Sequence, residues 1–291
     1  MKLTFYPILM FVCLFFCAGC TAYETQYEGP YTDGGNVNTS VNYEILFVEN
    51  GVLKFATPNL NKVKTLSAGA NITKASINYR HDRIAFKTAA GNVIVTDTAL
   101  STMLILPNTS GVLWFDWHAN NQTLYMLNAN STLSFYGPTI TVATTNLRTG
   151  LPGYFTNDLG IKTVAITPAG TVVFGVGLDQ SIGPESGVWV RNTDGKSTRL
   201  RTDYDAPTHL RLNADGSMAT AILNRGSTEW AYVNLVPNRE LLTRQNPSTF
   251  IAPSSSIEDE FVGWDILRQE LYLRKNQRRL KLSGFVSDLD W

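Results

Sequence analysis

Residues 164 to 174 read Val-Ala-Ile-Thr-Pro-Ala-Gly-Thr-Val-Val-Phe, and residues 210 to 220 read Leu-Arg-Leu-Asn-Ala-Asp-Gly-Ser-Met-Ala-Thr. Each stretch consists of a short apolar run, a small polar turn and a second run. Similar runs, rich in Val, Ile, Leu, Tyr and Thr, flank the pairs Asn50-Gly51 and Asp194-Gly195. Such turns between apolar runs are typical of β-hairpins. No convincing helical period occurs outside the N-terminal residues, so the sequence predicts an all-β fold.

The hairpin unit recurs along the chain at a regular spacing. Equivalent positions in the first strand of each unit are Ile77, Trp117, Ile166, Leu212, Ile266 and Trp291. Their successive separations are 40, 49, 46, 54 and 25 residues. The first four are close to the roughly 40–50 residues of a four-stranded propeller blade. The pattern therefore predicts a β-propeller, with a last interval too short for a whole blade.

The two ends of the repeat complement each other. Tyr43 to Leu66 resembles a blade without its first strand, and Phe285 to Trp291 is a strand without a blade. We therefore predict six blades, with the C-terminal strand joining the first blade and closing the ring, which leaves no free sheet edge. After Arg278 to Leu282 no residues remain for an outer strand of the last blade, which is expected to have three strands or to be completed by the N-terminal segment. A five-bladed ring with irregular ends is the alternative.

Two of the units resemble the TolB-like (WD40-like) β-propeller repeat. Ile166-Thr167-Pro168-Ala169-Gly170 and Leu212-Asn213-Ala214-Asp215-Gly216 are similar to its strand-turn pattern, and Trp117-His118-Ala119-Asn120-Asn121 is similar more loosely. The resemblance implies the propeller fold and a range of binding roles, because propellers serve both as scaffolds and as enzymes.

The N-terminus has the features of an export signal. Lys2 is followed by the apolar run Phe5 to Phe16, which is too short to span a bilayer. Cys17-Ala18-Gly19-Cys20 then resembles a bacterial lipobox, with Cys17 where leucine is usual. This predicts a signal peptide at residues 1–19, a lipid on Cys20, a tether at 20–42 and a single propeller domain at 43–291. Ordinary cleavage without lipidation is the alternative.

The same resemblance predicts the location of the protein. Acylation of Cys20 would anchor it in the cell envelope, and Thr21, which is not aspartate, favours the outer membrane facing the periplasm. Lys plus Arg and Asp plus Glu both number 24, and only 16% of residues are charged. This balance argues against nucleic acid or an anionic membrane surface as the main partner. The basic run from Arg268 to Lys281 could dock an acidic partner or lipid headgroups, but its alternation with leucine also fits a solvated hairpin.

Candidate site residues follow from the repeat. The positions one step before the repeated ones are Ser76, Asp116, Ala165, Arg211, Asp265 and Asp290. If the strands are equivalent, Asp116, Asp265 and Asp290 share one level of the central channel. There they could bind Ca²⁺ or a basic peptide, or accept hydrogen bonds from neighbouring backbone amides.

No motif indicates catalysis or a cofactor. The chain has no Gly-x-Ser-x-Gly elbow and no glycine-rich phosphate loop with lysine. The predicted function is a non-catalytic, lipid-anchored envelope protein whose propeller binds or scaffolds other envelope proteins. The alternative is a propeller enzyme that acts on envelope glycans or peptides through Asp116 with Asp265 or Asp290.

Overall fold

The computed structural model describes residues 41–66, 71–142, 144–149, 151, 160–177, 187–201, 207–212, 220–225, 229–235, 238–245, 248–254, 257, 260–275 and 277–291. Of these residues, those within 201–208 and 213–250 are described by their backbone alone. The predicted signal peptide, Cys20 and the tether up to residue 40 lie outside the described residues. Within the described part of the chain, no helix is long and apolar enough to cross a membrane.

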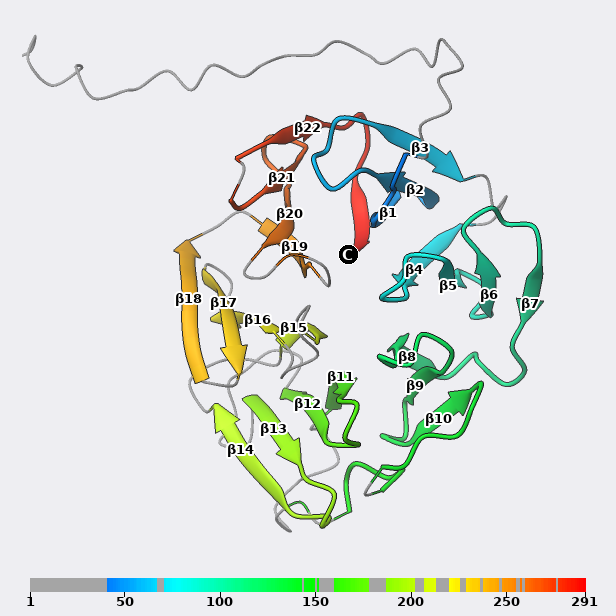
Figure 1. The fold of residues 1–291 in the computed structure, drawn as a ribbon. Helices are drawn as coiled ribbons and strands as arrows, with labels where there is room; N and C mark the ends of the chain where they lie inside the picture. Colours follow the sequence, from blue (N-terminus) through cyan, green and yellow to red (C-terminus); the bar gives the residue numbers. More distant parts are fainter. Residues whose placement is uncertain are drawn as a thin grey trace, which may run out of the picture. The chain divides into compact units, whose positions relative to one another are not determined.

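The described strands form six antiparallel sheets that stand around a ring (Figure 1). Sheet 1 contains β1 (Ile45–Glu49), β2 (Val52–Ala56), β3 (Val63–Leu66) and the C-terminal strand β23 (Val286–Asp290). Sheet 2 contains β4 (Ile72–Ile77), β5 (Arg83–Thr88), β6 (Val93–Asp97) and β7 (Met103–Ile105). Sheet 3 contains β8 (Val112–Trp117), β9 (Leu124–Asn128) and β10 (Leu133–Tyr136).

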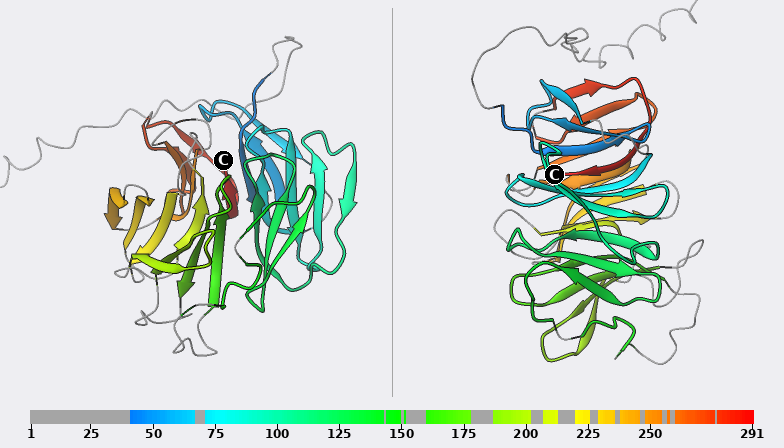
Figure 2. Two further views of the ribbon diagram at one scale, coloured as in Figure 1. Left: turned by 60° about the horizontal axis from the view of Figure 1, so that its bottom comes forward. Right: turned by 90° about the vertical axis from the view of Figure 1, so that its right-hand side faces the viewer.

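The remaining sheets complete the ring, which Figure 2 shows tilted and from the side. Sheet 4 contains β11 (Gly160–Ile166), β12 (Val172–Gly177), β13 (Gly187–Arg191) and β14 (Ser197–Arg201). Sheet 5 contains β15 (Pro207–Arg211), β16 (Thr220–Arg225), β17 (Glu229–Leu235) and β18 (Asn238–Gln245). Sheet 6 contains β19 (Ser248–Pro253), β20 (Phe261–Asp265), β21 (Glu270–Leu273) and β22 (Arg279–Lys281). The predicted all-β propeller fold is confirmed.

The C-terminal strand closes the ring as the repeat predicts. β23 pairs with β1 in antiparallel register, with Asp290 opposite Leu46 and Leu289 opposite Phe47. β1 continues into β2 through the Asn50-Gly51 turn, in which both residues have positive φ, as type I′ hairpin turns require. Trp291 then packs with Phe47 and with Trp264 of the neighbouring sheet in one buried cluster. The first and last parts of the chain therefore share a core.

Sheet 3 differs from the other sheets and corrects the prediction of six blades. Five sheets have four strands, whereas sheet 3 has three. Gly137, with φ of 108°, ends β10 directly before Pro138, which has no N–H to donate to a further strand pair. Thr145 and Leu147 return to bond the backbone of Leu133 and Ser131, but they form only an isolated bridge. The described residues thus form five complete four-stranded blades rather than six.

The prediction for the last blade is also wrong, because one repeat position was misplaced. Ile266 follows β20, the second strand of sheet 6, and the innermost strand is β19. Sheet 6 therefore has all four strands. Between β19 and β20 the sequence has no Asn-Gly or Asp-Gly pair, although Pro253 and the three serines after it are themselves turn residues.

Candidate functional site

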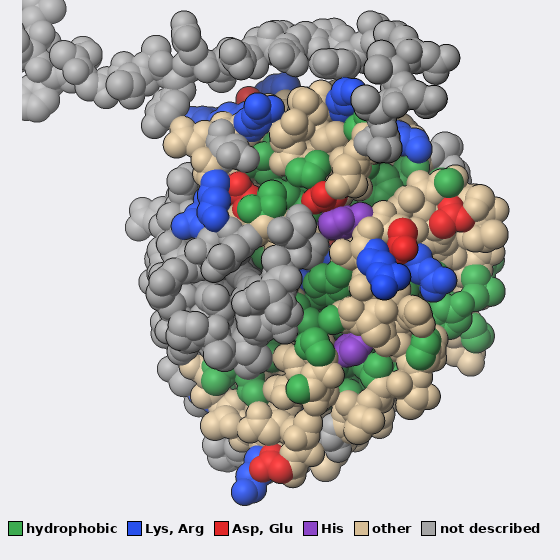
Figure 3. Space-filling view, in the orientation of Figure 1, with side chains coloured by type: hydrophobic (Ala, Val, Ile, Leu, Met, Phe, Trp, Pro, Cys, Tyr) green, Lys and Arg blue, Asp and Glu red, His purple; other side chains and the backbone are tan. Residues whose placement is uncertain are grey.

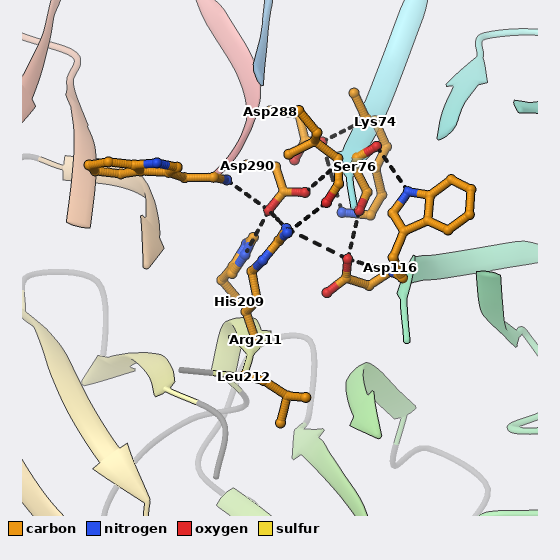
Figure 4. Close-up of polar contacts among 12 residues, drawn as sticks. Lys74, Ser76, Asp116, His209, Arg211, Leu212, Asp288 and Asp290 are labelled. Atoms are coloured by element: carbon orange, nitrogen blue, oxygen red, sulfur yellow. Dashed lines mark hydrogen bonds and ion pairs between the residues drawn. The ribbon is translucent and has the colours of Figure 1, made fainter. Parts of the chain in front are cut away.

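The innermost strands of four sheets bring polar side chains together in the channel (Figure 4). Arg211 of β15 reaches across to sheets 1, 2 and 3. Its Nη1 contacts Oδ1 of Asp290 on β23 and lies 3.7 Å from Oδ1 of Asp116 on β8. Its Nη2 donates to the carbonyl of Ile77 on β4 at 2.6 Å. One guanidinium thus connects four innermost strands, each from a different sheet.

Both carboxylates also accept hydrogen bonds from nearby donors. Asp290 accepts from the backbone N–H of Ile77 at 2.8 Å and of Trp291 at 3.0 Å. Asp116 accepts from the Ser76 hydroxyl at 2.6 Å and from the backbone N–H of Trp117 at 2.7 Å. Backbone amides are the partners that the sequence suggested as an alternative to a bound ion.

The network is closed to solvent. Arg211 and Asp116 have no exposed surface and Asp290 is 2% exposed. A buried carboxylate needs a paired charge or several hydrogen-bond donors, and Arg211 supplies the charge here. Within the residues that the structure describes, no three His, Cys, Asp or Glu side chains are grouped to hold a metal ion. The guanidinium therefore occupies the position between Asp116 and Asp290 that a cation or substrate would need.

Burial and charge set the pKa values in this network. Burial raises the pKa of Asp116 to about 6, against the opposing attraction of Arg211. For Asp290 burial acts in the same direction, but the attraction of Arg211 and His209 and the hydrogen bonds from Arg211 and Ile77 together hold its pKa below the usual value. The two carboxylates together hold the pKa of Arg211 above its ordinary value despite complete burial. Arg211 therefore stays charged at every working pH.

Asp265 does not belong to this network, which corrects the prediction of three carboxylates at one level. It lies on β20, the second strand of its sheet, rather than on the innermost strand. Its carboxylate accepts hydrogen bonds from the backbone N–H groups of Leu267 and Arg268 and lies 3.9 Å from the Arg268 side chain. Asp265 therefore stabilises the turn between β20 and β21.

A second level of side chains lies two residues earlier on the same strands. Lys74, Trp114, His209 and Asp288 precede Ser76, Asp116, Arg211 and Asp290 by two positions. Because side chains in a strand alternate between faces, residues two apart point the same way, about 6.7 Å apart along the strand. This period could have identified all four residues from the sequence once the first level was recognised.

This second level forms a pocket of about 230 Å³ at the channel mouth. Lys74 Nζ lies 3.6 Å from the centre of the Trp114 ring and 3.8 Å from Oδ2 of Asp288. Asp288 also accepts a hydrogen bond from the backbone N–H of Ala75 at 2.6 Å. Burial raises the pKa of Asp288 to about 6, more than Lys74 can offset. The other lining residues are Thr73, Leu113, Ile251 and Leu289.

His209 belongs to the second level, and its ring approaches Asp290 of the first level. Its ring is edge-on to Trp114 at 5.4 Å, and its Nε2 has no hydrogen-bond partner and lies 3.7 Å from Oδ1 of Asp290. Burial lowers the pKa of His209 to about 3. The imidazole is therefore neutral when folded but gains a proton below pH 6.5 when unfolded.

This difference predicts a pH dependence of stability. Between pH 6.5 and 3 the unfolded chain binds a proton at His209 that the folded chain does not, so stability falls as pH falls. We expect His209→Gln to remove this dependence, so that the variant gains about 2 kcal/mol relative to wild type between pH 7.5 and 5. Urea unfolding of both proteins at the two pH values measures the change. Equal pH dependence in the two proteins would show that His209 titrates normally in the fold.

Comparison with known proteins agrees with the architecture. No protein-family model and no curated protein matches the sequence. The crystal structure of TolB from Acinetobacter baumannii has a TM-score of 0.60 at 15% identity, and the match covers 87% of this chain and 67% of that chain. A chain in the crystal structure of a nidogen/laminin complex also has a TM-score of 0.60, at 10% identity, and the match covers 86% of this chain and 98% of that one. The chain thus has a TolB-like β-propeller fold, as its repeat predicts.

Proposed function

We propose that this protein is a non-catalytic, lipid-anchored protein of the bacterial cell envelope, and that its propeller binds another protein through the channel mouth. Cys20 in its lipobox-like setting supports the anchor. We predict that the lipid attaches the protein to the outer membrane, on the side that faces the periplasm. The fold likeness to TolB and to a chain from a nidogen/laminin complex is compatible with a binding role.

The observation that carries the binding role is the channel mouth. Leu113 lies on the innermost strand β8, where its side chain is 50% exposed beside the pocket. The Arg211 network closes the channel beneath this pocket. The volume of the pocket is about that of one or two side chains. A rigid concave site with apolar walls and a few charged groups suits a protruding side chain of a partner.

The geometry gives no support to catalysis by the channel carboxylates. Asp116 and Asp290 are buried and bound to Arg211, so neither faces a space that a glycan or peptide could enter. Asp288 is the carboxyl that reaches the pocket, and Lys74 lies beside it. Glycoside hydrolysis needs two carboxyls on opposite sides of the scissile bond. The described mouth residues offer one.

A matched pair of leucine variants tests the binding role. Leu113→Glu places a charge at the mouth without disturbing the core, because the side chain is half-exposed. Leu104→Glu is the control, since Leu104 is 47% exposed on the outer strand β7. We expect proteins that co-purify with wild type and with Leu104→Glu from detergent-solubilised membranes to be lost, by tenfold or more, with Leu113→Glu.

Mass spectrometry of the mature N-terminus in the same preparation tests the anchor separately. An unmodified Cys20 would refute lipidation. Equal recovery of every co-purifying protein with both leucine variants would refute binding at the mouth.

A further inference from the structure

The zero net charge of the chain conceals a one-sided surface on two neighbouring sheets. In sheets 1 and 6 and their connecting turns, every described charged residue that is exposed is Lys or Arg. Arg268 pairs with Asp265 at the β20–β21 turn. We call the remaining six, of which Arg279 also has an acidic partner in Glu270, the basic rim: Lys62, Lys64, Lys275, Arg278, Arg279 and Lys281. Figure 3 shows Lys and Arg side chains along this edge of the ring.

The acidic residues described in the same two sheets do not balance the rim. Glu44, Glu49 and Glu260 are buried, and Asp288 and Asp290 line the channel. Glu270 is half-buried and pairs with Arg279 at 3.3 Å. Elsewhere the exposed charges have mixed sign, as in Arg80, Asp82 and Arg83. Among the described residues, the exposed charges of sheets 1 and 6 are therefore all positive, whereas those of the other sheets have both signs.

The two halves of the rim are held together where the chain enters the propeller. Arg278 Nη1 donates to the carbonyl of Asn59 at 3.5 Å, which links the β21–β22 turn to the β2–β3 turn. Val41 and Asn42, which lead into β1, line a surface hollow of about 350 Å³ with Pro58 and Lys62. Val41 and Asn42, through which the chain enters β1, thus lie beside the basic rim.

The length of the segment between Cys20 and Asn42 limits the distance from the membrane. Cys20 precedes Asn42 by 22 residues, which can span at most about 75 Å. A lipid on Cys20 would hold the rim within this distance of the bilayer and raise its effective concentration there. Each Lys or Arg near an anionic surface strengthens binding by about 1 kcal/mol, and stable attachment commonly combines a lipid with a basic patch.

We propose that the basic rim docks onto the anionic headgroups of the membrane that holds the lipid anchor. The inference rests on the proposed anchoring of Cys20. Docking by the rim leaves the channel mouth free. The chain enters β1 beside the C-terminal end of the innermost strand β23. Lys74 and Leu113 of the mouth lie near the N-terminal ends of the innermost strands β4 and β8. The mouth thus opens on the face opposite to the entry of the chain.

Vesicle binding tests the rim without the lipid. The mature chain carrying Cys20→Ala is sedimented with vesicles of phosphatidylglycerol and phosphatidylethanolamine, and with vesicles of phosphatidylethanolamine and phosphatidylcholine. We expect binding to the anionic vesicles alone, and its loss in high salt because salt screens exposed charges. The triple variant Lys62→Gln/Lys64→Gln/Arg278→Gln should bind on the order of 100-fold more weakly.

The control removes the same charge from other sheets. Arg80→Gln/Arg83→Gln/Lys196→Gln should bind within about threefold of the parent protein, because these exposed residues lie outside the rim. Equal binding of the two triple variants, or equal binding to both kinds of vesicle, would overturn the proposal. An unmodified Cys20 in the native protein would refute the anchor but leave the vesicle result unchanged, so the two failures are distinguishable.

Discussion

Deletion of Phe285–Trp291 is expected to abolish cooperative folding of the propeller. The deleted segment contains β23, the innermost strand of sheet 1, and the buried side chains of Val286, Leu289 and Trp291. Burial of three such side chains stabilises by roughly 6–8 kcal/mol. Loss of Asp290 also leaves Arg211 without its closest partner, which costs a further 3–5 kcal/mol or so. The sum is comparable to the whole stability of a typical domain, about 5–15 kcal/mol.

Thermal unfolding followed by tryptophan fluorescence measures this effect. The truncated chain should show no sharp transition, and a synthetic peptide of residues 285–291 added in excess should restore one. A scrambled peptide of the same composition is the control and should restore nothing. A truncated chain that melts within a degree or two of wild type would mean that the ring does not depend on its closing strand.

Replacement of Arg211 by methionine is expected to produce the second largest effect. The variant leaves the carboxylates of Asp116 and Asp290 buried without a positive partner. Removal of one partner of a buried ion pair typically costs about 3–5 kcal/mol, because the remaining charge is uncompensated. The triple variant Arg211→Met/Asp116→Asn/Asp290→Asn removes the charges as well and should recover much of the loss.

The pH dependence of Arg211→Met follows from the same reasoning. Without the guanidinium, burial raises the pKa of both carboxyls above their unfolded values. The folded chain then holds protons that the unfolded chain has lost, so stability falls as pH rises above about 4. Urea unfolding should therefore show a larger deficit at pH 7.5 than at pH 5. Equal stability of the single and triple variants would contradict the central role of Arg211.

The sequence predicts the ring well because ring closure leaves a trace in the repeat. A first blade without its innermost strand and a C-terminal strand without a blade together predict the pairing of β23 with β1, which the structure contains. The short last interval is not part of this trace, because it results from placing the repeat position at Ile266 on the second strand of sheet 6. The number of complete blades is less visible. The fourth strand of sheet 3 is replaced by an isolated bridge after Gly137-Pro138, a local break that the spacing of the repeat positions does not register.

The channel network is only partly predictable. The repeat places Asp116, Asp290 and Arg211 at one level, but their pairing depends on how far each side chain reaches across the ring. Asp265 is misplaced because the repeat is aligned on Ile266 after β20, although Pro253 and the serines after it mark the end of β19. His209 and Lys74 become visible only when the period of two is applied to innermost strands already aligned.

Photo-crosslinking from the channel mouth tests the binding role most directly. A benzoylphenylalanine introduced at Leu113 in the native cell should crosslink to one dominant envelope protein, because the mouth holds a side chain of that partner. The same group at Leu104 should give no such product, since Leu104 lies on the outer strand β7. Crosslinking at Leu104 but not at Leu113, or at neither position, would contradict a propeller that binds its partner through the channel mouth.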